Sequence, residues 1–216
     1  LTAEHGGMLR AYADGGRPER LTDGLGSDWR FRGIALRRWP GASSLQPVIQ
    51  ATLALKQELG DAVVERVDVA LPSRAYALNG SSGWETPLSA LQSARWTVAV
   101  ALADGEVWIE QTTTRLADAD VARFASERVA VSEDLTLPAT GARVKCATSD
   151  GRYFERQVNV PAGDPTHPLT ATEVRQKLAR AASGVGLGDR VGSIVEAVEA
   201  LATAPSVAEL TGLLEA

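Results

Sequence analysis

The chain has 216 residues, 44% of them hydrophobic and 23% charged, and its formal net charge is -5. This composition is typical of an ordinary globular protein with one large or two small domains, and it excludes a disordered chain. A pI near 5.2 and the lack of a long Lys/Arg tract argue against binding to nucleic acid or to an anionic membrane surface. The longest apolar stretch, around residues 97–103, is far too short to cross a bilayer.

The start of the chain is itself informative. Leu1 is followed by neither a charged nor a long apolar signal region, and helical periodicity is already under way at Met8. We therefore expect the C-terminal part of a longer polypeptide, or the second subunit of a split one.

Local signals predict a helical start, a mixed middle and a helical end. In chain order they predict helices at residues 4–14 and 18–25, an extended segment at 30–38, a helix capped by Ser43 or Ser44 and continuing to Leu59, and a strand at 64–71. Further along they predict a buried helix from Pro87 to Leu102, a helix at 118–124, strands at 127–132, 142–148 and 153–160, a hairpin turn at 149–151, and helices with capping boxes at Thr170/Glu173 and Ser206/Glu209. The simplest organisation is a compact α+β domain at 30–163, with 1–29 and 164–216 belonging to a separate helical body.

Four arginines gather just before the predicted helix at Ser43, namely Arg30, Arg32, Arg37 and Arg38. In an acidic chain, such a cluster beside the unpaired amides of a helix N-terminus is suited to binding a carboxylate. The alternative is a solvated strand edge whose charges discourage aggregation. Chemistry alone leaves both interpretations open.

Few residues are suited to metal binding or proton transfer. Cys146 is the single cysteine and excludes an internal disulfide, and His5 and His167 cannot assemble a zinc site. We expect no metal and a reducing, cytoplasmic location. We interpret Cys146 as a small buried thiol, His167 as a loop-structuring residue and His5 as a surface or interface histidine.

Four stretches, in this order and spacing, carry a resemblance to a known family. They are PERLTDGLG at 18–26, LRRWP at 36–40, the segment from Ser93 to Gly105, and GDPTHPLT at 163–170 running into the Glu173 helix. Together they resemble the C-terminal half of the MmgE/PrpD family, which includes 2-methylcitrate dehydratase, cis-aconitate decarboxylase and iminodisuccinate epimerase.

This resemblance implies a fold and an active-site location. The family combines a large helical domain with a smaller α+β lid, and the active site lies between them. Residues 30–163 would be the lid, with the flanking helices returning to the helical domain. The family's catalytic histidines lie largely in the N-terminal half, its chemistry requires no cofactor, and its members form homodimers. A partner chain or N-terminal half is therefore expected to supply the general base.

The resemblance also implies site residues, with departures from the family pattern. Arg37 stands where the family has a substrate-facing lysine, and a guanidinium can grip a carboxylate but cannot transfer its proton. Gly41 and Ala42 stand where many members have a histidine or cysteine shortly after the proline. Ser93 is kept, whereas Trp96 replaces a tyrosine. The expected substrate-binding residues are Arg37, Trp39, Ser93, Arg95 and Trp96.

Three functions remain open at this stage. The first is the lid-bearing part of an enzyme that abstracts a proton next to a carbonyl or carboxylate, leading to dehydration, decarboxylation or isomerisation. Its substrate would be a carboxylate or β-keto compound less polar than a citrate, since indoles replace polar groups. The second is a catalytically silent structural subunit. The third is an ordinary 2-methylcitrate dehydratase-like lyase.

Overall fold

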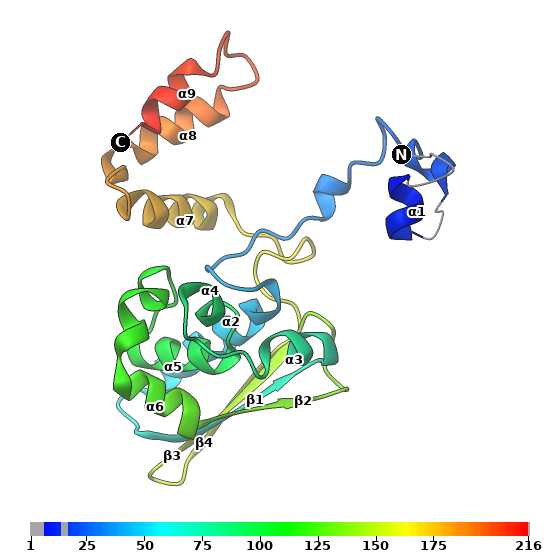
Figure 1. The fold of residues 1–216 in the computed structure, drawn as a ribbon. Coiled ribbons are helices and arrows are strands. Elements are labelled where there is room, and N and C mark those ends of the chain that lie inside the picture. The colour runs from blue at the N-terminus through cyan, green and yellow to red at the C-terminus, as the bar shows by residue number, and fades with distance from the viewer. Residues whose placement is uncertain (1–6, 14–16, 216) are drawn as a thin grey trace. The chain divides into compact units, whose positions relative to one another are not determined.

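The structure is a computed structural model that describes residues 7–13 and 17–215. Its chain contacts divide into two compact units, Leu1–Ile34 and Ala35–Ala216. Figure 1 shows the elements of both units. Within the described ranges, no helix is both long and apolar enough to span a bilayer.

The first unit contains short helical segments. They are α1 (Met8–Ala13) and the 3-10 helices η1 (Pro18–Leu21) and η2 (Arg30–Gly33). The prediction of an extended segment at 30–38 is wrong for its first half. A strand needs a partner edge for its backbone groups, and no described strand pairs with these residues. Instead the N–H of Ile34 donates to the carbonyl of Phe31 at 3.2 Å, which closes a tight turn.

The second unit is α+β, with a mixed sheet at its centre. The four strands are β1 (Val64–Leu71), β2 (Val129–Glu133), β3 (Ala142–Thr148) and β4 (Tyr153–Val158), in the order β2-β1-β3-β4. β1 and β2 are parallel, whereas β1–β3 and β3–β4 are antiparallel. Strands were therefore predicted correctly at 64–71, at 142–148 and, within two residues at an end, at 127–132 and 153–160.

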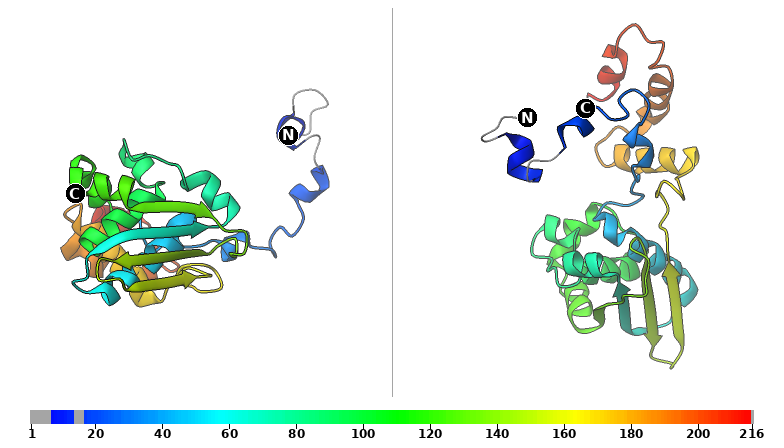
Figure 2. Two further views of the ribbon diagram at one scale, coloured as in Figure 1. Left: turned by 90° about the horizontal axis from the view of Figure 1, so that it is seen from below. Right: turned by 90° about the vertical axis from the view of Figure 1, so that its right-hand side faces the viewer.

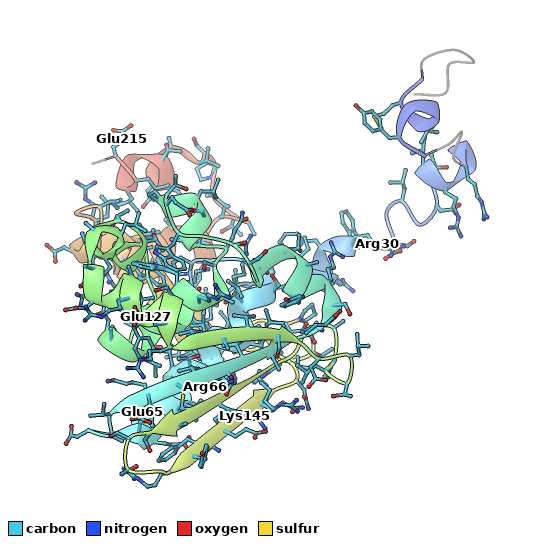
Figure 3. All side chains as sticks on the ribbon, turned by 60° about the horizontal axis from the view of Figure 1, so that its bottom comes forward. Arg30, Glu65, Arg66, Glu127, Lys145 and Glu215 are labelled. Atoms are coloured by element: carbon cyan, nitrogen blue, oxygen red, sulfur yellow. The ribbon has the colours of Figure 1, made fainter. Side chains whose placement is uncertain are left out.

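Helices cover one face of the sheet (Figure 2). They are α2 (Gln46–Leu59), which a 3-10 turn η3 (Ser43–Leu45) precedes, α3 (Ser73–Asn79), α5 (Ala94–Asp104) and α6 (Ala119–Glu127). Their apolar side chains meet those of the alternating strands, so that Leu55, Val67, Val98 and Val144 are fully buried together. The other face carries charged side chains, of which Figure 3 marks Arg66 and Lys145 on the neighbouring strands β1 and β3.

The buried helix predicted from Pro87 to Leu102 is interrupted. The structure has a single turn, α4 (Pro87–Ala90), and then α5. Ser93 breaks the run because its side chain caps α5 by accepting from the N–H of Trp96 at 3.4 Å. The sequence signals also missed the helix α3, which begins directly after Pro72.

The C-terminal helices are α7 (Ala171–Ser183), α8 (Val191–Glu199) and α9 (Ala208–Leu213). The capping box of Thr170 and Glu173 is confirmed, with both reciprocal hydrogen bonds present. The capping box predicted at Ser206 and Glu209 is wrong, because Ser206 Oγ instead accepts from the N–H of Ala208 at 3.1 Å. The predicted assignment of residues 1–29 and 164–216 to a separate helical domain stays a prediction.

One face of α7 carries ionic contacts at a spacing of one helical turn. Glu173 accepts from Arg38 Nη1 at 2.7 Å, and Lys177 Nζ donates to the carbonyl of Arg37 at 2.5 Å. One turn further on, Arg180 binds Glu106 and Glu110, each at 2.9 Å. Because residues at i, i+4 and i+7 share a helix face, these contacts hold one side of α7 against residues 37–38 and 106–110 of the same unit.

Because Gly163 has no side chain, the backbone of Leu36, which precedes Arg37, can approach it very closely. The N–H of Leu36 donates to the carbonyl of Gly163 at 2.8 Å, and a Cβ added to Gly163 would lie 1.9 Å from the carbonyl oxygen of Leu36. Gly163 also has a φ of +95°. We expect Gly163→Ala to lower the free energy of unfolding by about 3 kcal/mol or more, because the clash is with backbone and adds to left-handed strain.

Gly151→Ala is the matched control. Gly151 also has a positive φ, +80°, but nothing lies within 4 Å of its added Cβ. Gly151→Ala should therefore lower the free energy of unfolding by only about 1 kcal/mol, the cost of the left-handed backbone conformation. Urea unfolding of both variants measures the difference, and equal losses would mean that the approach of Leu36 to Gly163 is not tightly constrained.

Candidate functional site

A surface hollow of about 470 Å³ lies where α3 and α4 meet the start of the helical run that continues into α2. Its lining combines cations, hydroxyls, amides and leucines: Arg37, Gly41, Ala42, Ser43, Ser44, Arg74, Leu78, Asn79, Leu88, Leu91 and Gln92. These residues include two arginines and no Asp or Glu. The hollow is therefore suited to an anion.

The segment that enters the hollow is held by one buried side chain, Gln46. Its Oε1 accepts from the N–H groups of Arg38 at 3.0 Å and Trp39 at 3.2 Å. Its Nε2 donates to the carbonyls of Trp39 at 3.1 Å and Ala42 at 3.5 Å. The side chain of Gln46 is almost completely buried, at 3% exposure, and all of these bonds fall on residues 38–42. Gln46 therefore fixes the backbone between Arg37 and the helix start.

The helical run begins at the edge of the hollow. Ala42 stands before it in an extended conformation and provides no side-chain cap. The N–H groups of Ser43 and Ser44 donate to no acceptor among the described residues. Since the run continues from Ser43 through Leu59, its first amides carry the partial positive charge of a helix N-terminus. Arg37 lines the same hollow as these serines, and the binding of a carboxylate there stays a prediction.

Three of the clustered arginines, Arg30, Arg37 and Arg38, have different surroundings. Arg30 binds Asp28 at 3.0 Å in the first unit, and Arg38 binds Glu173 at 2.7 Å. Arg37 is exposed and donates from Nη1 to the carbonyl of Gly41 at 2.8 Å, with no carboxylate partner in the described part of the chain. Arg74, which was not predicted as a site residue, is exposed and pairs with no described residue. Arg37 and Arg74 therefore bring positive charge to the hollow that no acid neutralises.

Asn79 and Ser44 form the floor of the polar side. Ser44 Oγ donates to Asn79 Oδ1 at 2.5 Å, and Asn79 Nδ2 donates to the carbonyl of Gln92 at 2.8 Å. Asn79 is buried, so these bonds satisfy its amide and link α3 to the turn before α5. No sequence signal pointed to Asn79, because its partners lie far along the chain.

Of the predicted site residues, only Arg37 lines the hollow. Trp39 is half-buried, and the guanidinium carbon of Arg38 lies over its ring, 5.3 Å from the ring centre. Ser93 is fully buried, and its hydroxyl donates to the carbonyl of Ser82 at 2.7 Å. Arg95 is half-buried, and its Nε has no hydrogen-bond partner among the described residues.

Trp96 lies in the core. It is fully buried, stacks on Trp84 with ring centres 5.8 Å apart, and donates from Nε1 to the carbonyl of Gln111 at 3.3 Å. Its indole is therefore part of the packed helical layer. Contact of Trp39, Ser93, Arg95 and Trp96 with a substrate stays a prediction.

The described residues that could transfer protons, Cys146, Lys177 and His167, are not among those that line the hollow. Burial, and secondarily Asp68, raises the pKa of the Cys146 thiol to about 12, so it stays protonated and unreactive at neutral pH. Burial first and then the charge of Arg37 lower the pKa of Lys177, but its ammonium donates to the carbonyl of Arg37. His167 lies in an exposed turn with its ring 3.4 Å from the carbonyl of Val160, and His5 lies outside the described residues.

Comparison with known proteins identifies the family. The model of the MmgE/PrpD C-terminal domain matches residues 39–203. The chain therefore belongs to the MmgE/PrpD family and contains its C-terminal domain, which confirms the family predicted from the sequence.

A curated relative adds a second comparison. The chain is similar to the cis-aconitate decarboxylase-like protein oryM of Aspergillus oryzae (strain ATCC 42149 / RIB 40), with 27% identity over 231 residues. The match covers 97% of this chain and 48% of the relative. The chain thus spans about half the length of the curated relative it matches.

Proposed function

We propose that this chain is the carboxylate-binding, lid-bearing part of an MmgE/PrpD-like lyase or isomerase. The reaction abstracts a proton next to a carbonyl or carboxylate and then eliminates water, releases carbon dioxide or reprotonates the substrate. The observation that carries this proposal is a hollow without acidic residues, lined by Arg37 and by Ser43 and Ser44, whose N–H groups have no acceptor among the described residues. The family and the decarboxylase-like relative support the reaction class.

In this proposal, the chain binds and orients the substrate without moving its proton. Arg37 holds an anionic group, and the helix amides stabilise the same negative charge. The residues lining the hollow include no group that titrates near neutral pH. The general base is therefore proposed to come from a helical half or partner subunit, with no metal or organic cofactor, and the assembled unit is proposed to be a cytoplasmic homodimer.

Two alternative functions each have one observation in their favour. A catalytically silent structural subunit is favoured by Gly41 and Ala42, which put no titratable side chain on the segment after Pro40. An ordinary 2-methylcitrate dehydratase-like lyase is favoured by the paired cations of Arg37 and Arg74, which suit a polycarboxylate.

A steady-state assay of the complete protein separates the three functions. We expect no turnover of 2-methylcitrate or cis-aconitate and measurable turnover of a bulkier, less polar β-keto acid. Turnover of 2-methylcitrate at a kcat near the common enzyme value of about 10 per second would establish the ordinary dehydratase instead. A folded assembly that is inactive on every compound would favour the structural subunit.

Arg37 should contribute more to substrate affinity than Arg30. Arg37→Ala should raise KM by the equivalent of about 1.5–3 kcal/mol, because it removes a charged hydrogen bond from a partly desolvated site. Arg30→Ala is the matched control, since its side chain is 92% exposed and pairs with Asp28 in the other unit. Equal, small effects on KM would support the interpretation of the cluster as solvated surface charge.

The C-terminal helices should require a helical partner. Ile194 is buried within the chain, but Val198 and Leu201 on the same stripe are 51% and 41% exposed. Such an uncovered stripe favours association. We expect the isolated chain to bind a hydrophobic dye and to self-associate in light scattering, and a monomer that unfolds cooperatively without binding the dye would contradict the proposal of a partner.

A further inference from the structure

The hollow has an apolar side that the proposed anion contacts do not use. Leu78 on α3 and Leu88 on α4 are 56% and 67% exposed, and both line the hollow with the half-buried Leu91. Single exposed leucines are common on protein surfaces. Here, however, three leucines from neighbouring segments share one concave surface with two guanidiniums.

The polar side of the hollow offers several hydrogen-bond donors and contains no carboxylate. Arg37 and Arg74 carry the positive charge, and the amides of Ser43 and Ser44 have no acceptor among the described residues. The carbonyl and amide of Asn79 are already occupied by Ser44 and Gln92. Because the lining has two guanidiniums and no carboxylate, these donors favour an acceptor that bears negative charge.

We propose that the hollow binds an amphipathic carboxylate, with its anionic head between Arg37 and Arg74 and an aliphatic chain along Leu78, Leu88 and Leu91. This inference rests on the proposed function and specifies the substrate class of the same site. A citrate-like acid would place carboxylates against leucine side chains, where they lose hydration without gaining a partner. An aliphatic chain instead removes apolar surface from water on both sides of the contact.

Binding of straight-chain acids to the complete protein tests the proposal. The probes are butyrate, hexanoate and octanoate, with citrate as the polar comparison, and their affinities are measured by calorimetry. Each added methylene should increase affinity about threefold, somewhat less than expected for full burial because the hollow is open. Octanoate should bind more tightly than citrate. Equal affinities along the series, or tightest binding of citrate, would overturn the inference.

Matched variants assign the chain-length dependence to the leucines. Leu88→Gln and Leu78→Gln should flatten the series and weaken octanoate much more than butyrate, because the longer chain has more contact with the leucines. Leu135→Gln is the control, since Leu135 is 79% exposed and does not line the hollow. A series that keeps its slope in Leu88→Gln and Leu78→Gln would show that the chain binds elsewhere, or that another part of the protein covers these leucines.

The head group is tested separately, so that the two proposals can fail independently. Arg74→Gln should weaken all the straight-chain acids by a similar factor of about tenfold and keep the slope of the series. If Arg37→Ala and Arg74→Gln abolish butyrate binding but the series is flat, the anion site stands and the amphipathic ligand is rejected. If no acid binds to the folded protein, both proposals are rejected.

Discussion

The arrangement of the site depends on one buried amide. Gln46 is the first residue of α2, and its side chain is buried. It accepts hydrogen bonds from two backbone N–H groups of residues 38–42 and donates to two backbone carbonyls of the same segment. An unpaired amide in that position would cost about 1–3 kcal/mol, so the preceding segment is held in the one conformation that satisfies it. That conformation brings Arg37 to the hollow and leaves the first amides of the helical run open. A hydrocarbon or a charged side chain at this position could not hold the same turn, because it could not donate and accept at once.

A second constraint acts on the same segment from α7. Arg37 and Arg38 are adjacent in the chain but differ in their contacts with α7. Glu173 forms an ion pair with the guanidinium of Arg38, whereas Lys177 donates a hydrogen bond to the backbone carbonyl of Arg37. The carboxylate of Glu173 therefore pairs with Arg38 and not with Arg37, and its hydrogen bonds in the capping box with Thr170 fix its orientation. Hydrogen bonds from the Thr170 backbone and hydroxyl, and then the charge of Arg38, lower the pKa of Glu173, so this acid stays ionised well below neutral pH. The result is a division of the arginine cluster into structural charges and a charge that remains free for a ligand.

Local signals in the sequence were sufficient for much of the fold. Alternation located β1 and β3, the Ser149-Asp150-Gly151 turn located the hairpin, and the Thr170 box located α7. The failures arose where distant contacts decide. Ser93 interrupts an apolar run because it both caps α5 and binds the carbonyl of Ser82. In the site, Arg37 was found through a family resemblance, whereas Arg74 and Gln46 were missed. Arg74 lines the same hollow as Arg37 because α3 packs against the start of the helical run, and nothing in its own neighbourhood in the sequence indicates that position.

The apolar character of the proposed substrate therefore has a different structural origin from the one that sequence comparison suggested. The exchange of a tyrosine for Trp96 pointed to a larger, less polar pocket, but the indole is enclosed against Trp84 and its N–H is occupied by Gln111. It stabilises the layer behind the hollow. The residues that present apolar surface to the hollow include leucines on α3 and α4, and the segment that joins these short helices is held by the hydrogen bond from Ser93 to the carbonyl of Ser82. Leu78 and Leu88 are exposed on these helices and can change with little effect on the core, whereas Ala75 and Ala90 of the same helices are buried in it. Selectivity for the apolar part of a substrate can thus vary independently of the cationic end that Gln46 and α7 hold in place.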